Sequence, residues 1–368
     1  MKKKLISLLL CFAMLCVCVF AVADNPAVTG KVTEVEKYGH ARLDVTFEDF
    51  NAAGFELGDI VTVKAGTFEG DMPCFDGYYV EIGESMVRAQ PTDDAIAVCI
   101  NYGRFADAAG IGPGDEVTIT LKEKAGALAM QNVNSLVYTN DRSDYDSDEV
   151  FANFRPVIVG EIGEGKLYRS CSPVNNKYGR RAVAGRLIEQ AGIKAVMNMA
   201  DTDEEIAGYA AEEDFDSAYY WDLVQNGHVI ALGMPVDFSS DAFGETIVKG
   251  LTFLSGQETP YLIHCTEGKD RAGFGSMIVE MLMNASAEEI VADYLISYVN
   301  YYHLDPVADA EKLEMIAEKN VRKMVLIVAG LEDSADLANT DLAAAAENYL
   351  IAHGMDAEAL TTLKEKLR

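Results

Sequence analysis

The stretch His264-Cys265-Thr266-Glu267-Gly268-Lys269-Asp270-Arg271 follows the apolar run Tyr261-Leu262-Ile263 and precedes a helix-compatible run, residues 274–283. That order predicts a strand, a tight loop and the N-terminus of a helix. The backbone N–H groups of such a loop point inward and, with the positive end of the helix dipole, bind an oxyanion. The same field stabilises the thiolate of a cysteine at the start of the loop, and an arginine offers a two-pronged donor for phosphate oxygens. The eight residues therefore predict a nucleophile, an anion cradle and a clamp.

The segment 151–368 alternates predicted strands and helices around this loop. Strand-compatible runs are 166–169, 195–199, 229–234 and 260–264, and helix-compatible runs are 179–191, 241–254, 287–301, 307–329, 342–353 and 357–367. Such alternation predicts an α/β fold with a largely parallel central sheet flanked by helices. Sheets of this kind place ligands at the carboxyl ends of their strands, which is where the loop lies.

The pattern His-Cys-x5-Arg resembles the signature of the cysteine-dependent tyrosine phosphatases, and its Gly-Lys-Asp interior is similar to their bacterial tyrosine and phosphoinositide phosphatase branch. Further elements that resemble this branch are Asn153-Phe154-Arg155, Leu167-Tyr168-Arg169-Ser170, Asp293-Tyr294 and Tyr298-Val299-Asn300-Tyr301. The resemblance covers 151–368 and implies a tyrosine-phosphatase-like catalytic domain that needs no metal or other cofactor.

The predicted roles follow from the chemistry of phosphate transfer. The thiolate of Cys265 attacks phosphorus and forms a phosphocysteine, and Arg271 clamps the oxygens that carry the transition-state charge. His264 is expected either to orient the loop through hydrogen bonds or to be a packed residue at the end of the strand. The predicted phosphate-binding residues are Thr266, Glu267, Gly268, Lys269, Asp270 and Arg271.

Three aspartates compete for the role of general acid, which protonates the leaving oxygen. Asp270 is the first choice, because the resemblance implies that the loop aspartate of this branch serves as the acid. Asp201 and Asp237 are alternatives, since each follows a predicted strand on the same sheet edge.

Two departures from the family pattern affect the predicted turnover. Ala272 stands where the family usually has Ser or Thr, whose hydroxyl helps the cysteine leave the phosphoenzyme, so a slow second step is expected. Glu267 places a carboxylate in a phosphate loop and must point away from the substrate. A third residue, Cys171, is a candidate to pair reversibly with Cys265 upon oxidation.

Three functions remain open. The first is hydrolysis of phosphotyrosine, with or without dual specificity. The second is hydrolysis of inositol phosphates or phosphoinositides, which a basic group near the site would favour. The third is phosphate binding by a pseudophosphatase. The basic group consists of Arg169, Lys177, Arg180, Arg181 and Lys269.

The 368 residues carry a formal net charge of −29. Nucleic acid and anionic membrane surfaces are poor partners for such a chain, so the expected partner is a phosphorylated protein or a small phosphorylated substrate. Residues 1–23 read as a signal peptide, with lysines at positions 2–4, an apolar stretch and a small-x-small site, Ala21-Val22-Ala23. This predicts a secreted or cell-envelope protein without membrane insertion after cleavage; an uncleaved N-terminal membrane anchor is the alternative.

An internal repeat marks residues 27–135. The stretches 52–62 and 108–118 each contain a Gly-Asp turn and an alternating strand, which predicts a small, mostly β barrel. The stretches 80–85 and 96–103, together with the Gly-Asp strands, resemble the small β-barrel domain of the SAM hydroxide adenosyltransferases. Because the catalytic domain of that family is missing here, we interpret the module as accessory. Residues 136–150 form a predicted acidic linker.

Overall fold

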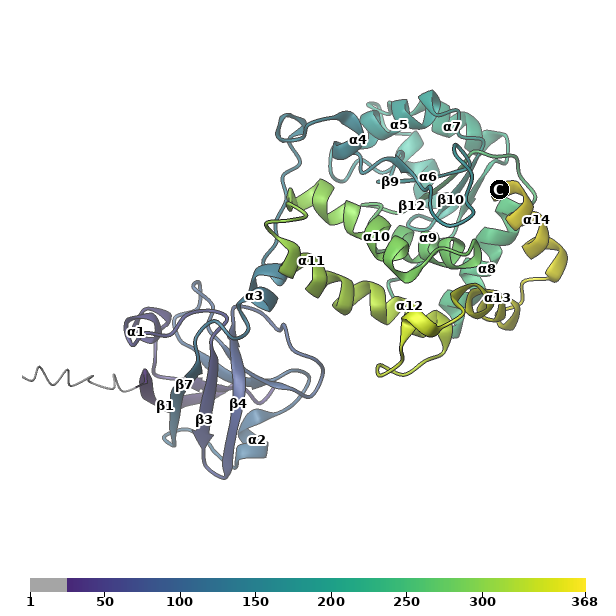
Figure 1. Cartoon of the computed structure of the whole chain (residues 1–368). Coiled ribbons are helices and arrows are strands. Elements are labelled where there is room, and N and C mark those ends of the chain that lie inside the picture. The colour runs from purple at the N-terminus through teal and green to yellow at the C-terminus, as the bar shows by residue number, and fades with distance from the viewer. Residues whose placement is uncertain (1–24) are drawn as a thin grey trace, which may run out of the picture. The chain divides into compact units, whose positions relative to one another are not determined.

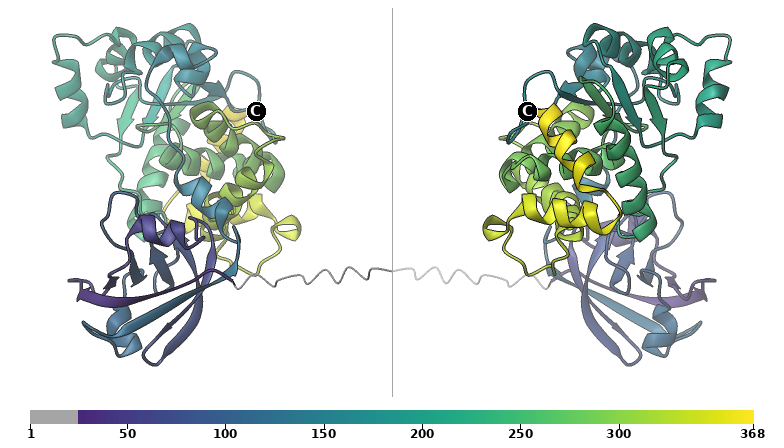
Figure 2. Two further views of the ribbon diagram at one scale, coloured as in Figure 1. Left: turned by 90° about the vertical axis from the view of Figure 1, so that its left-hand side faces the viewer. Right: turned by 90° about the vertical axis from the view of Figure 1, so that its right-hand side faces the viewer.

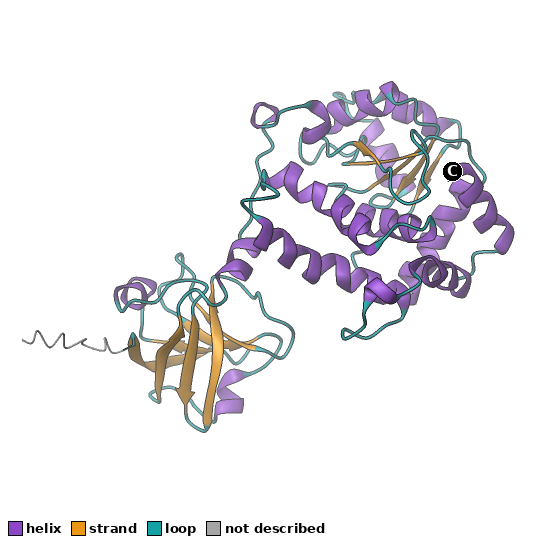
Figure 3. Ribbon diagram, viewed as in Figure 1, coloured by secondary structure: helices purple, strands orange, loops and turns teal. Residues whose placement is uncertain are grey.

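The computed structural model describes residues 25–368, so the predicted signal peptide, residues 1–23, lies outside the described residues. The chain divides into two compact units, the first ending at Gln131 and the second spanning Asn132–Arg368. Strands dominate the first unit, whereas helices surround a sheet in the second (Figure 3). Within residues 25–368, no helix combines the length and the apolar character that crossing a membrane requires.

The first unit is a closed barrel whose strand order is β1-β2-β6-β5-β4-β3-β7. Its strands are β1 (Ala27–Val35), β2 (Ala41–Leu43), β3 (Ile60–Ala65), β4 (Phe68–Phe75), β5 (Ser85–Arg88), β6 (Ala97–Ile100) and β7 (Glu116–Glu123). Three helices accompany them: α1 (Phe47–Ala52), α2 (Phe105–Ala109) and α3 (Leu128–Asn134). Alternate residues of the strands point into the barrel, as Val61, Val63 and Ala65 of β3 do. The predicted mostly β barrel is confirmed.

The two copies of the internal repeat form two turns of the barrel that have the same geometry. A glycine with positive φ, Gly58 (+88°) or Gly114 (+95°), precedes the aspartate of each turn. The carboxylates of Asp59 and Asp115 each accept a hydrogen bond from the backbone N–H three residues earlier, at 2.7 and 2.8 Å. Strands β3 and β7, which leave these turns, pair with each other in antiparallel fashion. The repeat therefore starts two neighbouring strands by the same local device.

The second unit contains a five-stranded sheet in the order β11-β10-β12-β9-β8. The strands are β8 (Arg155–Pro156), β9 (Leu167–Ser170), β10 (Ala195–Asn198), β11 (Val229–Ala231) and β12 (Tyr261–His264). All neighbouring pairs are parallel except β8 with β9. Strand β12 lies between β10 and β9, so its carboxyl end opens at the middle of the sheet edge.

Helices cover this sheet on both faces (Figures 1 and 2). They are α4 (Asp148–Phe151), α5 (Arg181–Gln190), α6 (Asp203–Ala210), α7 (Ala218–Gln225), α8 (Asp241–Ser255), α9 (Asp270–Leu282), α10 (Ala287–Tyr302), α11 (Ala310–Ile316), α12 (Lys323–Ala329), α13 (Leu342–Ala352) and α14 (Ala357–Leu367). Two 3₁₀ turns, Arg142–Asp144 and Leu337–Asn339, and a π-helical stretch, Ala317–Arg322, complete the unit.

Two hydrophobic cores hold the helices on the sheet. Val196 and Leu262 pack in one core with residues of α5 and α7. Met197 and Ile263, the next residues along the same strands, pack in the other core with residues of α8 and α9. Because successive strand residues point to opposite faces, each strand is buried on both sides. This explains why the strands read as continuous apolar runs.

The structure differs from the sequence expectation in several elements. The single helix expected over 307–329 consists of α11, the π-helical stretch and α12. The strand expected over 229–234 ends at Ala231, because Gly233 adopts a positive φ of +53°. Helices α6 and α7 were not expected. Thr202 and Glu205 form a capping box, which is a sequence signal for the N-terminus of α6.

The segment 136–150, expected as an acidic linker, lies in the second unit instead of between the units. Most of its acids are exposed, but Tyr145 is only 4% exposed and packs against the rings of Phe151 and His303. The acidic composition of the segment predicted a solvated linker, although the buried ring of Tyr145 anchors the segment to the second unit.

Candidate active site

The loop 265–269 connects β12 to α9 at the carboxyl edge of the sheet. Cys265 directly follows β12 and is 3% exposed, and Asp270 is the first residue of α9. The predicted order of strand, loop and helix N-terminus is therefore present. The first turn of α9 directs free backbone N–H groups toward the loop, which favours an anion there.

Three consecutive loop carbonyls, those of residues 267–269, are bound by donors from three distant parts of the chain. The hydroxyl of Tyr301 donates to the first at 2.7 Å. The amide of Asn153 donates to the first and second at 3.2 Å. The guanidinium of Arg169 donates to the second and third at 3.0 and 3.1 Å. Because the C=O and N–H of a trans peptide point in opposite directions, the N–H groups that follow these carbonyls face away from the three donors.

Gly268 is the residue that the loop geometry requires at its tightest point. Its φ is +70°, and a Cβ atom built there would lie 2.2 Å from the carbonyl oxygen of Ser170 and 2.7 Å from the backbone nitrogen of Cys171. Real Cβ atoms do not approach backbone so closely, so the loop packs directly on the chain that follows β9.

Replacing Gly268 by alanine is expected to destabilise the protein by about 2 kcal/mol or more, because backbone strain adds to the steric overlap. Phosphate release should fall with it, since the loop must shift. The matched control is Gly165→Ala, where φ is +71° and nothing lies within 4 Å of the new Cβ. Urea unfolding of both variants measures the difference; equal losses would show that the overlap at Gly268 is relieved without cost.

A buried charge cluster holds Arg169 in place. Asp293 accepts from Arg169 Nη1 at 2.5 Å and from Arg155 Nε at 3.0 Å. Burial works to raise the pKa of Asp293, but the two guanidiniums outweigh it and hold that pKa below its usual range. Glu280 lies beside Asp293, and burial together with that negative charge raises the pKa of Glu280 well above its usual value. The two guanidiniums therefore favour the ionised form of Asp293, whereas burial disfavours the ionised form of Glu280.

His264 belongs to a chain of hydrogen bonds that supports the start of the loop. Burial lowers its pKa to about 3, so the imidazole is neutral. Its Nδ1 lies 3.4 Å from the Cys265 carbonyl, which can only accept, so Nδ1 carries the proton and Nε2 accepts from Tyr220 at 3.2 Å. Asn198 donates to the Tyr220 hydroxyl and to Asp201, each at 3.1 Å. The order of donors fixes the tautomer of His264.

The side chains of Arg271 and Glu267 are also fixed. Arg271 donates from Nη1 to the Met234 carbonyl at 2.8 Å and from Nη2 to the Thr266 hydroxyl at 3.1 Å. The guanidinium is thus held against the loop. The Glu267 carboxylate accepts from the hydroxyl of Tyr138, as expected for an acid directed to a partner other than the substrate.

Lys269 is packed among aromatic side chains. Its Nζ donates to the Tyr302 hydroxyl at 3.1 Å and lies 5.3 and 5.4 Å from the ring centroids of Tyr298 and Tyr302. The carboxylates of Glu267 and Asp270 lie 3.8 and 4.0 Å away. The cation expected at the mouth of the site is therefore partly neutralised.

The three candidate acids differ in their surroundings. Asp270 receives a long hydrogen bond of 3.4 Å from Tyr294, and burial raises its pKa. Asp201 is 3% exposed; its carboxylate accepts from two amide side chains, and burial raises its pKa as well. Asp237 is exposed on the loop after β11. Asp270 is the one of the three that belongs to the phosphate loop itself.

The prediction of a basic group available near the site is wrong for three of its five members. Arg169, Arg180 and Arg181 are each at most 2% exposed and are used inside the protein. Arg180 donates to backbone carbonyls and lies over four aromatic rings. Arg181 forms ion pairs with the acids at 212, 214 and 216. Of the four members between residues 169 and 181, Lys177 alone is exposed. The three arginines are buried because carbonyl, carboxylate and aromatic groups of the same unit contact them.

Cys171, considered as a redox partner of Cys265, is 1% exposed. Burial, reinforced by the nearby Cys265, raises the pKa of Cys171 to about 12. Its sulfur is therefore a thiol at neutral pH, which disfavours its attack on an oxidised neighbour.

Sequence reasoning missed the supporting residues as parts of the site. Asn153, Arg155, Asp293 and Tyr301 all lie in the elements that resembled the phosphatase branch, but no role followed from their positions alone. Tyr138 lies outside those elements, and nothing in its surroundings in the sequence connects it to Glu267.

A cysteine and an arginine on one loop between a strand and a helix, at the edge of an α/β sheet, form the arrangement expected of a phosphatase. A sequence model described as "Tyrosine phosphatase family" matches residues 160–368, which is more than half of the chain. The chain therefore belongs to the tyrosine phosphatase family, and its second unit carries the phosphatase domain. None of the curated proteins matches the chain.

Two solved structures show limited similarity. An uncharacterized conserved protein from Thermotoga maritima is 24% identical over 27% of this chain, with a TM-score of 0.24, and the chain spans 38% of its length. The core catalytic domain of the PP-IP phosphatase SIW14 from S. cerevisiae, in complex with citrate, is 22% identical over 46% of this chain and 92% of its own, with a TM-score of 0.27. At these scores neither similarity bears on the function.

Proposed function

We propose that the second unit hydrolyses phosphomonoesters through a phosphocysteine on Cys265, with phosphotyrosine as its main substrate. The observation that carries this proposal is the fixation of the loop carbonyls of residues 267–269 by outside donors. That fixation prepares the opposite face of the loop for an oxyanion before the substrate arrives. Arg271, held by a backbone carbonyl and a hydroxyl of the loop, completes the cradle.

The proposed reaction has two steps. The thiolate of Cys265 attacks phosphorus, the bond from phosphorus to the ester oxygen breaks, and Asp270 gives its proton to the departing oxygen. Water then attacks the phosphocysteine, its proton passes to Asp270, and the sulfur departs as a thiolate. Phosphate is released, and both side chains return to their starting protonation states.

The buried arginines favour a simple phosphomonoester over a polyphosphorylated one. The preference for inositol phosphates rested on a basic surface, and three of its members are instead enclosed. The partly exposed ring of Tyr302 beside Lys269 offers packing for an aromatic leaving group. These observations support phosphotyrosine as the substrate and inositol phosphates as the second candidate.

The test is phosphate release from a phosphotyrosine peptide, a phosphoserine peptide and inositol hexakisphosphate. We expect the phosphotyrosine peptide to be hydrolysed with the highest kcat/KM. A higher kcat/KM for the inositol phosphate would transfer the proposal to the second candidate. Binding of all three without release would indicate a pseudophosphatase.

We propose in addition that the protein is exported, on the strength of residues 1–23. N-terminal sequencing of the protein recovered from the cell envelope or the medium is expected to begin at Asp24. Recovery with residues 1–23 intact in the membrane fraction would favour the anchor.

Asp270→Asn is expected to lower kcat/KM on phosphoserine peptide by roughly 10²-fold, because an alkoxide leaving group needs a proton in the first step. With p-nitrophenyl phosphate the loss should be much smaller. Since burial raises the pKa of Asp270, the acid stays protonated to higher pH than an ordinary aspartate, and wild-type kcat/KM falls as the pH rises through that pKa. The variant should lack this fall. Asp201→Asn and Asp237→Asn serve as comparisons; whichever of the three variants alone loses the fall identifies the acid.

Ala272→Ser is expected to speed the second step, because the new hydroxyl can hydrogen-bond the departing sulfur of Cys265. Ala272 is fully buried, so serine, the smallest hydroxyl residue, is preferable to threonine. Stopped-flow measurements should show a burst of leaving group in the wild type and a smaller burst with faster steady state in the variant. Identical burst and steady-state rates would mean that dephosphorylation of the enzyme is not limiting.

A further inference from the structure

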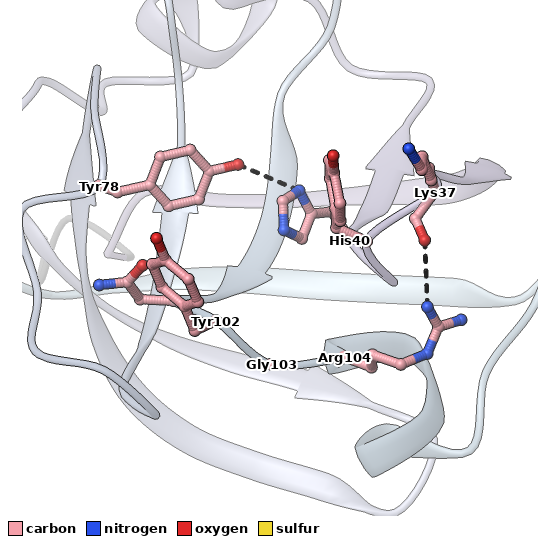
Figure 4. A pocket seen from close by; sticks show the side chains of 8 residues that line it. Lys37, His40, Tyr78, Tyr102, Gly103 and Arg104 are labelled. Carbon is pink, nitrogen blue, oxygen red and sulfur yellow. Dashed lines mark hydrogen bonds between the residues drawn. The ribbon is translucent and has the colours of Figure 1, made fainter.

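The barrel unit carries a cavity that the phosphatase chemistry does not use. Its volume is about 580 Å³, which lies in the range of small-molecule sites. The lining residues come from the turn before β2, the segment after β4 and the turn after β6 (Figure 4). They are Lys37, Tyr38, His40, Tyr78, Asn101, Tyr102, Gly103 and Arg104.

Three tyrosines give this cavity its character. Tyr38, Tyr78 and Tyr102 are 65%, 43% and 91% exposed, so large parts of each side chain meet solvent. Tyr102 also has a φ of +53°, a left-handed conformation that is uncommon for a residue other than glycine. Neither the exposure nor the backbone conformation of Tyr102 stabilises the barrel. Strain of this kind, held on an exposed ring, is typical of a binding site.

The turn that presents Tyr102 is held rigidly. The side chain of Asn101 donates to the Val80 carbonyl at 2.8 Å, and its backbone N–H donates to the Glu84 carbonyl at 2.9 Å. The backbone N–H of Gly103 closes the turn on Ile100 at 3.1 Å. The ring is thus presented by a fixed turn, which reduces the entropy lost when a ligand binds.

His40 offers a hydrogen-bond acceptor in the same cavity. Its Nδ1 lies 3.2 Å from a carboxylate oxygen of Glu36 and 3.1 Å from the hydroxyl of Tyr78, the latter drawn in Figure 4. A carboxylate only accepts, so Nδ1 carries the proton, and because burial lowers the pKa of His40 the ring is neutral. Nε2 is then an acceptor, and within residues 25–368 it has no protein partner. It suits a hydroxyl group of a ligand.

The charge of the lining points to an acidic ligand. Lys37 and Arg104 line the cavity, and among residues 25–368 no acidic side chain belongs to its lining, although the chain carries a net charge of −29. Arg104 is positioned by its hydrogen bond to the Lys37 carbonyl at 3.1 Å, which Figure 4 shows. It also donates to the Asp107 carboxylate at 2.5 Å. In an acidic protein, such a basic lining favours an anion locally.

We propose that this cavity binds an acidic saccharide. A sugar ring can pack its C–H face on an exposed tyrosine ring while its hydroxyls stay hydrated. A flat aromatic ligand on the same tyrosine would leave its outer apolar face in water. Exposed tyrosines therefore suit a saccharide better than an aromatic ligand. The carboxylate of the saccharide meets Lys37 and Arg104, and a hydroxyl donates to His40. The barrel thereby attaches the phosphatase to a polymer of uronic acids or a related acidic glycan.

The proposal is tested with the full chain by calorimetric titration of trigalacturonate against cellotriose and p-nitrobenzoate, an aromatic anion that the phosphatase site cannot hydrolyse. We expect trigalacturonate to bind at least tenfold more tightly than the other two. Tyr102→Ala should weaken trigalacturonate binding tenfold or more, and Tyr102→Phe should restore it, because the ring is kept. Neither variant should change phosphatase activity, which keeps this test separate from that of the catalytic site.

Lys37→Ala tests the charge, with Lys64→Ala as its control, since Lys64 is exposed on β3 outside the cavity. We expect a tenfold loss for the first variant and none for the second. The proposal is overturned if trigalacturonate does not bind, if cellotriose binds as tightly, or if Tyr102→Ala binds like the wild type.

Discussion

Cys265→Ser is expected to abolish measurable phosphate release, a loss of roughly 10⁴-fold or more. The serine hydroxyl remains protonated at neutral pH and is a poor nucleophile, whereas the loop and the helix N-terminus favour a thiolate at this position. The change removes no tether of the loop, since the carbonyls of residues 267–269 keep their donors. The variant should therefore still bind inorganic phosphate and unfold at the wild-type temperature.

The matched control is Cys171→Ser, which changes a second buried cysteine of the same unit in the same way. It should retain turnover once the folded fraction is taken into account. Mass spectrometry of the wild type, quenched in acid during turnover, should find phosphate on the peptide that contains Cys265. If Cys265→Ser stays within tenfold of the wild type, another residue is the nucleophile.

Arg169→Met is expected to destabilise the protein by about 3–5 kcal/mol, the range for removal of one partner from a buried ion pair. Arg169 is 1% exposed, and its loss leaves Asp293 with one guanidinium and removes a donor from the carbonyls of residues 268 and 269. Methionine keeps much of the volume of the arginine side chain, so the loss of stability measures the loss of charge and hydrogen bonds. We expect kcat to fall as well, because the loop loses one of its three tethers.

Arg186→Met provides the comparison, because Arg186 pairs with Asp148 at 3.1 Å but is 54% exposed. A surface pair contributes about 0–1 kcal/mol, so this variant should unfold near the wild-type urea concentration. Similar losses in the two variants would mean that the cluster around Asp293 behaves like a surface pair and does not hold the loop.

The sequence predicted the local part of the site and missed the part that depends on distant contacts. The loop from His264 to Arg271 was readable because nucleophile, glycine and arginine are consecutive and follow a strand. The donors to the loop carbonyls could not be predicted from the sequence, because a hydrogen bond between residues as distant as Asn153 and Gly268 leaves no local sequence pattern. The resemblance located these donors within quoted elements, but only the fold showed what they bind.

The basic residues show the limit of reading charge from sequence. Arg180 and Arg181 look like a surface pair at the start of a predicted helix, yet both are buried. Burial of an arginine depends on whether the fold brings acceptors to it, here the carbonyls around residue 151 and the acids of residues 212–216. Tyr145 is the reverse case, because an acidic neighbourhood concealed a residue of the core.

The separations between the loop and its tethers have a consequence for how the enzyme becomes active. Glu267 and Gly268 are bound by Asn153, 114 and 115 residues away, by Arg169, 99 residues from Gly268, and by Tyr301, 34 residues from Glu267. Closing such long loops is slow and comes late in folding. A growing or partly folded chain thus holds its cysteine in an unorganised loop, and chemical competence arrives only when strands β9 and β12 and helix α10 have assembled. Activity is therefore a direct measure of completed folding of the second unit.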